Sequence, residues 1–221
     1  MNAPDTRLQS LFDPATVVVV GASADPGKWG HQYAKSLLLG RERRRVLLVN
    51  ARRAPVLGEA TFASCADLPV APEVAVICVP APAVEDAVRE AVAAGARYVV
   101  CITAGFAELG AAGRERQRAL VQSVRDAGAR LIGPNCYGVI DYETDFECRS
   151  FWTTARGPVG LVSQSGTVLL ELSARCDDVG LGLSRAVSMG NESDLTAADF
   201  LRAFESHRTT RAVVAYLEDM K

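Results

Sequence analysis

The stretch that decides the fold is VVVVGASADPGKWG, residues 17–30. Four consecutive β-branched residues predict a buried strand that ends at Gly21. A helical pattern containing Tyr33, Leu37 and Leu38 follows and closes near Gly40. The sequence therefore predicts a strand, a glycine-rich loop and a helix, in which free backbone N–H groups and the positive end of the helix can hold a phosphate.

Further strand and helix patterns alternate downstream of this unit. Apolar runs predict strands at 46–49, 74–79, 98–102 and 130–132, and amphipathic segments predict helices at 83–94 and 113–127. Alternation of this kind is typical of an α/β fold with a parallel, doubly wound sheet. We assign residues 1–140 to this first domain.

A second α/β unit follows a change in the residue pattern of the sequence. Residues 141–157 are a polar and aromatic mixture without a clean period, which predicts an interdomain linker. Strands are then expected at 159–162, 184–187 and 211–217, with a helix that runs to Arg175 and another at 197–204. Residues 158–221 thus form a partial second domain, and its strand 211–217 should be an exposed sheet edge that invites self-association or a completing partner.

Composition excludes several classes of protein. Of 221 residues, 49% are hydrophobic and 23% charged, which suits a packed globular chain, and the formal net charge of -2 gives no reason to expect nucleic acid or a membrane as partner. No apolar run approaches the roughly 18 residues of a membrane span, so we expect a cytoplasmic protein. The six cysteines lack paired spacing and only two histidines are present, so neither disulfides nor a metal site is expected.

The first loop departs from the dinucleotide fingerprint. That fingerprint requires glycine at 21, 23 and 26, whereas this chain has Ser23 and Pro26. An NAD site also places an acidic residue at the end of the second strand, where Asn50-Ala-Arg-Arg53 stands instead. Arginine suits a ribose phosphate, which leaves NADP and coenzyme A open, beside the simpler readings of a turn without ligand and of solvent-exposed arginines.

Three more loops follow the third, fourth and fifth predicted strands. They read VPAP from Val79 to Pro82, ITAGF from Ile102 to Phe106, and GPNCYG from Gly133 to Gly138. Carboxyl ends of parallel strands are where open α/β sheets bind ligands. Proline and glycine are common in any loop, so each loop alone is weak evidence. Their recurrence after three successive strands favours a ligand site along this edge.

The sequence resembles the α-type portion of the succinyl-CoA synthetase superfamily, most closely the NDP-forming acyl-CoA synthetases such as ADP-forming acetate-CoA ligase. The resemblance covers nearly the whole chain in order. Its motifs are Leu11-Phe-Asp-Pro14, Val19-Val-Gly-Ala-Ser23 with Pro26-Gly-Lys28, Val79-Pro-Ala-Pro82, Thr103-Ala-Gly-Phe-Ala-Glu108, Gly133-Pro-Asn-Cys136, Ser163-Gln-Ser-Gly166, Ser188-Met-Gly-Asn191 and Tyr216-Leu-Glu218.

The resemblance implies a CoA-binding Rossmann-like domain followed by the beginning of a flavodoxin-like ligase domain. It places the first loop against CoA, a basic residue at Arg53 against the phosphate of the carrier, and 102–104 along the pantetheine. The expected CoA contacts are Gly21, Ala22, Ser23, Ala24, Asp25, Pro26, Gly27, Lys28, Asn50, Arg53, Val79, Pro80, Ala81, Pro82, Ile102, Thr103, Ala104, Asn135 and Cys136.

Relatives of this family join an acid to CoA through an acyl phosphate and a phosphohistidine. By resemblance, Glu218 occupies the position that steadies the phosphohistidine, but neither His31 nor His207 stands in the family's phosphohistidine context. Ser165 fits either a helix cap or an acyl or phosphate contact. Succinate-specific enzymes carry Glu where this chain has Ala104 and Tyr where it has Leu170, which argues against succinate as the acid.

The resemblance further implies partners. ATP or GTP with Mg²⁺ would act only through domains missing here or through an ATP-grasp β-like subunit or domain, and a homo-oligomer is expected. The leading hypothesis is therefore the CoA-binding α-like portion of an acid-thiol ligase that binds CoA or acyl-CoA. Two alternatives remain open: a non-catalytic CoA-binding regulatory or scaffold protein, motivated by the absent histidine, and an NADP-binding oxidoreductase.

Overall fold

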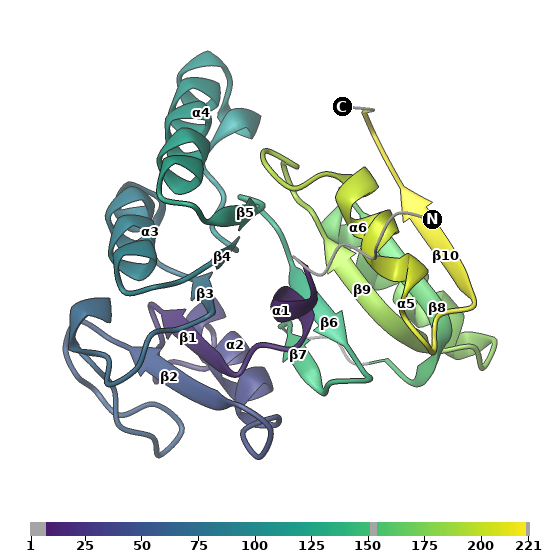
Figure 1. Cartoon of the computed structure of the whole chain (residues 1–221), viewed down its shortest axis with the longest axis horizontal. Helices are drawn as coiled ribbons and strands as arrows, with labels where there is room; N and C mark the ends of the chain where they lie inside the picture. Colours follow the sequence, from purple (N-terminus) through teal and green to yellow (C-terminus); the bar gives the residue numbers. More distant parts are fainter. Residues whose placement is uncertain (1–7, 151–153, 220–221) are drawn as a thin grey trace.

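The computed structural model describes residues 8–150 and 154–219, which form two five-stranded sheets that lie side by side (Figure 1). The first sheet has the strand order β2-β1-β3-β4-β5, and all its pairings are parallel. Its strands are β1 (Thr16–Val20), β2 (Arg45–Val49), β3 (Val74–Ile77), β4 (Tyr98–Cys101) and β5 (Arg130–Ile132). The parallel sheet predicted from the apolar runs is confirmed.

Helices cover both faces of this sheet because its strands are apolar on both sides. Val17 and Val19 of β1 pack with α2 (Trp29–Leu38), whereas Val18 and Val20 belong to a separate core with α3 (Val84–Ala93) and α4 (Ala111–Asp126). Successive side chains of a strand point to opposite faces, so the four-valine run supplies both cores at once. This is the doubly wound arrangement that the alternating pattern predicts.

The second sheet is mixed and has the order β10-β8-β9-β6-β7. Strands β8 (Arg156–Ser163), β9 (Leu183–Ser188) and β10 (Ala212–Tyr216) are parallel to one another, while β6 (Gly138–Asp141) runs antiparallel to both β9 and β7 (Phe146–Cys148). The helices of this unit are α5 (Gly166–Asp178) and α6 (Ala197–Glu205). Strand β10 lies at the edge and is exposed along its length, as expected.

The segment 141–157, which the sequence predicts to be an interdomain linker, includes regular structure. It contains β7 and the start of β8, and the β6–β7 hairpin that leads into it pairs with the second sheet. Residues 151–153 lie outside the described part. A pattern of period two is absent here because polar residues of the hairpin find partners inside the protein, as the Asp141–Arg185 ion pair illustrates.

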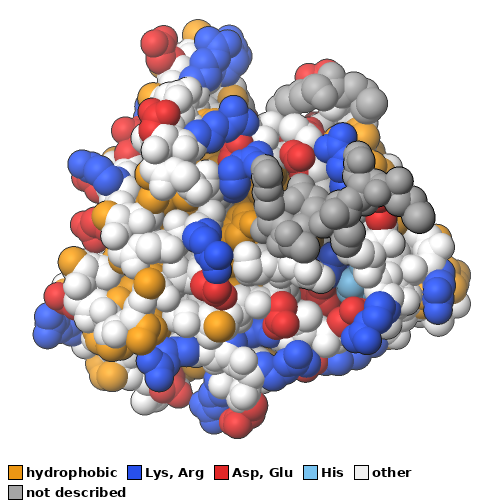
Figure 2. Space-filling model, in the orientation of Figure 1, with side chains coloured by type: hydrophobic (Ala, Val, Ile, Leu, Met, Phe, Trp, Pro, Cys, Tyr) orange, Lys and Arg blue, Asp and Glu red, His pale blue; other side chains and the backbone are white. Residues whose placement is uncertain are grey.

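Short elements complete the chain. The helix α1 (Gln9–Phe12) lies between the sheets and contacts β6 (Figure 1), and one hydrophobic core runs from α1 and β1 through β7 to β8 and β9. Three single-turn helices, η1 (Cys65–Asp67), η2 (Ala81–Ala83) and η3 (Ala107–Leu109), occupy loops of the first sheet. Side chains of both charges are interspersed over the face in Figure 2. Within 8–150 and 154–219, no helix is long and apolar enough to cross a bilayer.

Candidate functional site

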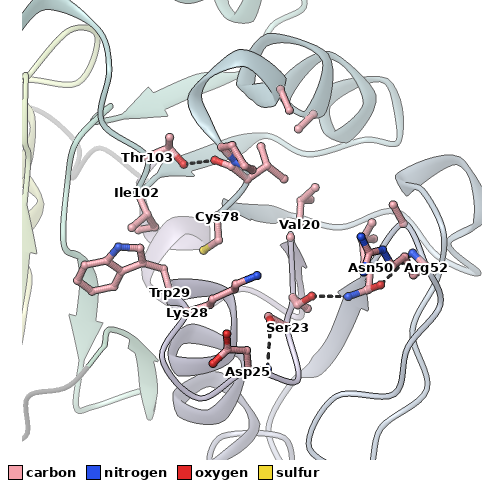
Figure 3. A pocket seen from close by; sticks show the side chains of 18 of the residues that line it. Val20, Ser23, Asp25, Lys28, Trp29, Asn50, Arg52, Cys78, Ile102 and Thr103 are labelled. Carbon is pink, nitrogen blue, oxygen red and sulfur yellow. Dashed lines mark hydrogen bonds between the residues drawn. The ribbon is translucent and has the colours of Figure 1, made fainter. Parts of the chain in front are cut away.

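A cleft of about 1070 Å³ lies at the carboxyl ends of the strands of the first sheet. Its walls come from the loops that follow β1, β2, β3, β4 and β5, together with the start of α2 and one side of α3 (Figure 3). The five loops meet because carboxyl ends of parallel strands share one edge of the sheet. The cleft thus lies where the recurring loops predict a ligand.

Two glycines shape the loop between β1 and α2. Gly21 has φ +91°, a conformation that side chains rarely adopt, and Gly30 packs so tightly that a Cβ there would lie 1.9 Å from the carbonyl oxygen of Gly21. Gly30 therefore allows the close helix approach for which the dinucleotide fingerprint uses its third glycine, four positions earlier. The loop is longer than in that fingerprint, and Ser23 and Pro26 lie within the added span.

The loop presents backbone donors to the cleft. Within the described part of the chain, the backbone N–H groups of Ser23 and Ala24 have no hydrogen-bond acceptor. The turn around them is held by local bonds: Ser23 Oγ accepts the Asp25 N–H (3.1 Å), Asp25 Oδ1 accepts the Gly27 N–H (2.9 Å), and His31 Nδ1 lies 3.0 Å from the Ser23 carbonyl oxygen. A loop fixed in this way keeps the donors available for an anion.

Two cations line the same end of the cleft. Lys28 and Arg52 are exposed, and neither side chain has an acidic partner among the residues that the structure describes. Figure 3 shows Lys28 extending from the start of α2 into the cleft, opposite the loop that carries Asn50 and Arg52. The Asn50 side chain holds this corner together, because it donates to the Ala22 carbonyl (2.8 Å) and accepts the Arg52 N–H (2.9 Å).

Arg53, the basic residue expected at the phosphate, does not line the cleft. Its backbone has φ +53°, and its guanidinium pairs with Asp67 at 3.3 Å. The turn after β2 therefore presents Arg52 to the cleft instead. The position of a basic residue at this strand end was predictable, but the choice between neighbours depended on a left-handed turn that the sequence did not reveal.

The opposite end of the cleft is lined largely by uncharged side chains. Thr103 Oγ1 donates to the Val79 carbonyl (2.6 Å), and the Asn135 N–H donates to the Thr103 carbonyl (3.1 Å), so the loops after β3, β4 and β5 are tied together. Burial raises the pKa of the Cys136 thiol to about 12, and burial also raises the pKa of Cys78 well above its ordinary value. Both thiols therefore stay protonated and act as walls of the cleft.

Two aromatic side chains close this end and were missed from the sequence. Trp29 and Tyr137 meet edge to face, with ring centroids 5.6 Å apart. The Tyr137 ring covers Gly166, where a Cβ would lie 2.2 Å from the ring. Tyr137 therefore packs against the first turn of α5. Lone aromatic residues beside glycine carry no sequence pattern that distinguishes a cleft wall from core.

Most of the predicted contacts line the cleft, and four do not. Those that line it are Gly21, Ala22, Ser23, Ala24, Asp25, Gly27, Lys28, Asn50, Val79, Pro80, Ile102, Thr103, Ala104, Asn135 and Cys136. Pro26, Arg53, Ala81 and Pro82 lie outside its lining. Acidic residues of α3 that the sequence reading did not select, Asp86 and Glu90, border the cleft as well.

The two residues considered for catalysis lie at the second sheet. Ser165 caps α5, since its hydroxyl accepts the Val168 N–H at 3.3 Å. Glu218 is exposed just beyond β10, and neither residue lines the cleft. His207 is buried, with Nε2 3.5 Å from Asp141 Oδ1. In the described ranges, no group of three or more His, Cys, Asp or Glu residues could hold a metal.

Comparisons with known proteins agree with this geometry. Residues 15–141 match a CoA binding domain and residues 156–221 match a succinyl-CoA ligase like flavodoxin domain. The chain is 34% identical to the α subunit of acetate–CoA ligase (ADP-forming) I of Pyrococcus furiosus, over 97% of this chain and 47% of that protein. It is 29% identical to 4-hydroxybutyrate–CoA ligase (ADP-forming) of Nitrosopumilus maritimus, over 95% of this chain and 30% of that protein.

A solved structure shows the same arrangement of both sheets. The dinucleotide forming acetyl-coenzyme A synthetase 1 of Ca. Korarchaeum cryptofilum superposes with a TM-score of 0.92 at 32% identity, over 97% of this chain and 46% of that one. The chain thus spans about half the length, or less, of the relatives it matches. The cleft, with its donors and cations, lies within the segment that matches the first family. The chain belongs to the CoA-binding domain family and joins such a domain to a succinyl-CoA ligase-like flavodoxin domain.

Proposed function

We propose that the cleft binds coenzyme A with its phosphates at the loop after β1 and its thiol end toward Tyr137. The observation that carries this proposal lies at one end of the cleft, where the Ser23 and Ala24 amides have no acceptor, and Lys28 and Arg52 no acidic partner, among the residues that the structure describes. Backbone donors and cations together favour a phosphorylated ligand. The neutral far end, with Ile102 and protonated thiols, suits an uncharged pantetheine arm.

Coenzyme A fits this cleft better than a nicotinamide dinucleotide. No carboxylate stands at the end of β2 to accept bonds from ribose hydroxyls, and Asn50 is engaged with Ala22 and Arg52. A second charged half of a dinucleotide would meet the apolar Ile102 and the aromatic pair of Trp29 and Tyr137. A linear amide arm that ends in a thiol needs only the narrow path that these groups leave.

The chain would then serve as the CoA-binding α-like portion of an NDP-forming acyl-CoA synthetase. Such an acid-thiol ligase needs a nucleoside triphosphate, Mg²⁺ and a phosphoryl-carrying histidine. We propose that the nucleotide and Mg²⁺ act through an ATP-grasp β-like subunit or domain, as the α-subunit relatives suggest, and that the histidine belongs to a further part of the flavodoxin-like ligase domain. Glu218, at the carboxyl end of β10, would face the phosphoryl carrier, and Ser165 would serve chiefly as the cap of α5.

The proposal predicts a ligand order in thermal unfolding. CoA should stabilise the chain by about 2.7 kcal/mol at a hundredfold excess over its dissociation constant. Dephospho-CoA, which lacks the 3′-phosphate, should stabilise it less, and NAD should not stabilise it. A larger response to NADPH than to CoA would replace this proposal with the NADP-dependent oxidoreductase. Turnover of acid, CoA and ATP after addition of an ATP-grasp partner would exclude a purely regulatory CoA-binding protein.

A further inference from the structure

The turn that carries Glu218 is held by one side chain, that of Gln164. Gln164 Oε1 accepts the backbone N–H groups of Glu218 (2.6 Å) and Asp219 (3.1 Å), and its Nε2 donates to the Asp219 carbonyl (2.8 Å). The turn lies at the exposed edge of the second sheet, where β10 has a partner strand on one side only. Three bonds to a single amide group therefore fix the backbone from which the Glu218 carboxylate projects.

Glu192 fixes Gln164 in turn. It is 4% exposed and has φ +47°, an unusual backbone conformation for a side chain of this size. Its Oε1 accepts the Ala197 N–H at the start of α6 (2.6 Å), and its Oε2 accepts a hydrogen bond from Gln164 Nε2. Because a carboxylate only accepts, it permits one orientation of the amide, the orientation in which Oε1 faces the turn.

The loop that carries Glu192 is fastened to the first sheet. The Asn191 N–H donates to the Pro134 carbonyl (3.0 Å), and Ser193 Oγ donates to the Gly133 carbonyl (2.6 Å). The next residue, Asp194, is buried and accepts the Leu131 N–H (2.7 Å) as well as bonds from two arginines, Arg125 and Arg130. Loop 191–194 is thus joined to the end of β5 by backbone, hydroxyl and ionic contacts.

The end of β5 is also a wall of the cleft. Asn135 and Cys136 line it, and Asn135 Nδ2 donates to Asn191 Oδ1 (3.3 Å). Packing is tight at this junction, since a Cβ on Gly190 would lie 2.3 Å from the Asn135 carbonyl oxygen. A ligand that presses on the segment 133–136 therefore acts on the loop that holds Glu192, because close-packed contacts transmit such displacements.

We propose that Gln164 and Glu192 are positioning residues for Glu218, and that loop 191–194 links their arrangement to occupancy of the cleft. Their importance for chemistry rests on the proposed function, whereas their hold on the turn does not. Ligand bound beside Asn135 should favour the hydrogen bonds that join Glu192 to Gln164 and Gln164 to the backbone of Glu218 and Asp219. The turn that carries Glu218 should then be less mobile. The Glu218 carboxylate would then be ordered when the thiol carrier is in place.

Amide hydrogen exchange by NMR on the whole chain tests this pair. Gln164→Glu places a carboxylate against Glu192 and removes the donor to Asp219, so exchange at the Glu218 and Asp219 amides should accelerate on the order of tenfold, in keeping with the loss of about one net hydrogen bond. In the double variant Gln164→Glu with Glu192→Gln, the amide at position 192 can donate to the carboxylate at position 164. This variant should recover most of the protection of the Glu218 and Asp219 amides. Gln122→Glu, on the exposed face of α4, is the matched control and should change neither amide.

Addition of CoA separates the two parts of the proposal. CoA should slow exchange at these two amides in the wild type and in the double variant, but not in Gln164→Glu. Equal exchange in the wild type and Gln164→Glu, with CoA binding intact, would overturn the positioning role and leave the proposed function standing. Absence of CoA binding, with exchange still faster in Gln164→Glu, would overturn the proposed function and the link to the cleft while supporting the positioning pair.

Discussion

The two neighbouring arginines after β2 point to different surroundings because the backbone turns at Arg53. Arg52 lines the cleft without an acidic partner in the described chain, whereas Arg53 has φ +53° and pairs with Asp67. The amino-acid types alone predicted a cation at this strand end, since arginine suits a phosphate. They could not select the residue, because a left-handed backbone in a non-glycine residue depends on contacts made after folding.

This difference gives a prediction at the scale of one side chain. Arg52→Ala should weaken CoA binding about tenfold, as expected for one lost charge-assisted contact, while Arg53→Ala should leave it nearly unchanged. Calorimetric titration of both variants with CoA and with dephospho-CoA measures this. If Arg52 contacts the 3′-phosphate, its loss should matter less for dephospho-CoA. A larger loss in Arg53→Ala than in Arg52→Ala would contradict the geometry of the turn.

Among the elements, the five strands of the first sheet were predictable because each is an apolar run, and the structure confirms them within a few residues. The β6–β7 hairpin was not. Its Asp141 is buried against Arg185 of β9, and both are stabilised by tertiary contacts that a local pattern does not contain. Arg44 likewise depends on tertiary contacts, since it is buried over the ring of Phe146.

The ion pair between β6 and β9 predicts a pH dependence. Burial opposes ionisation of Asp141, but the nearby His207 and the charge and hydrogen bonds of Arg185 outweigh it and hold the pKa of Asp141 below the ordinary 3.8. A lowered folded-state pKa means that the stabilisation is fully present above the unfolded-state pKa and is lost as the pH falls through the folded-state value. Acid should therefore loosen this sheet before it affects the first sheet, whose central strands have apolar side chains on both faces.

Asp141→Asn tests the pair directly. It leaves Arg185 buried without its counter-charge and should lower the free energy of unfolding at neutral pH by about 3–5 kcal/mol. Between neutral pH and about pH 3, its urea-unfolding free energy should also fall less steeply than that of the wild type. Asp126→Asn, on exposed α4, is the control. An unchanged pH slope in Asp141→Asn would show that other carboxylates govern acid unfolding.

At the scale of the whole molecule, β10 forms an edge of the second sheet with no partner strand on its outer side among the described residues. Val213, Val214 and Tyr216 are each more than a third exposed, and the edge carries no charged residue within the strand. Such edges pair readily with other strands. The wild type should therefore associate with rising concentration in sedimentation experiments, and Val214→Lys should reduce association without loss of fold. A wild type that remains monomeric at high concentration would contradict this expectation.

The comparisons show which families the two parts of the chain match. The individual CoA contacts and the division of the chain at residues 140 and 158 stay predictions. The parallel, doubly wound fold of the first sheet could be predicted, because it follows from the alternation of apolar runs with helical segments. The link between the two units could not be predicted, because it depends on tertiary contacts such as the ion pair between buried Asp194 and partly exposed Arg130. The candidate site lies at the carboxyl ends of the strands of the first sheet, where its position follows from the fold but its individual contacts depend on tertiary structure.

The most direct measurement is a calorimetric titration of the folded chain with coenzyme A. Saturable heat at one CoA per chain, reduced on joint replacement of Lys28 and Arg52 by alanine, is the predicted result. The absence of saturable heat from well-folded protein over the millimolar range of CoA would contradict the central claim that this cleft holds the phosphorylated end of a thiol carrier.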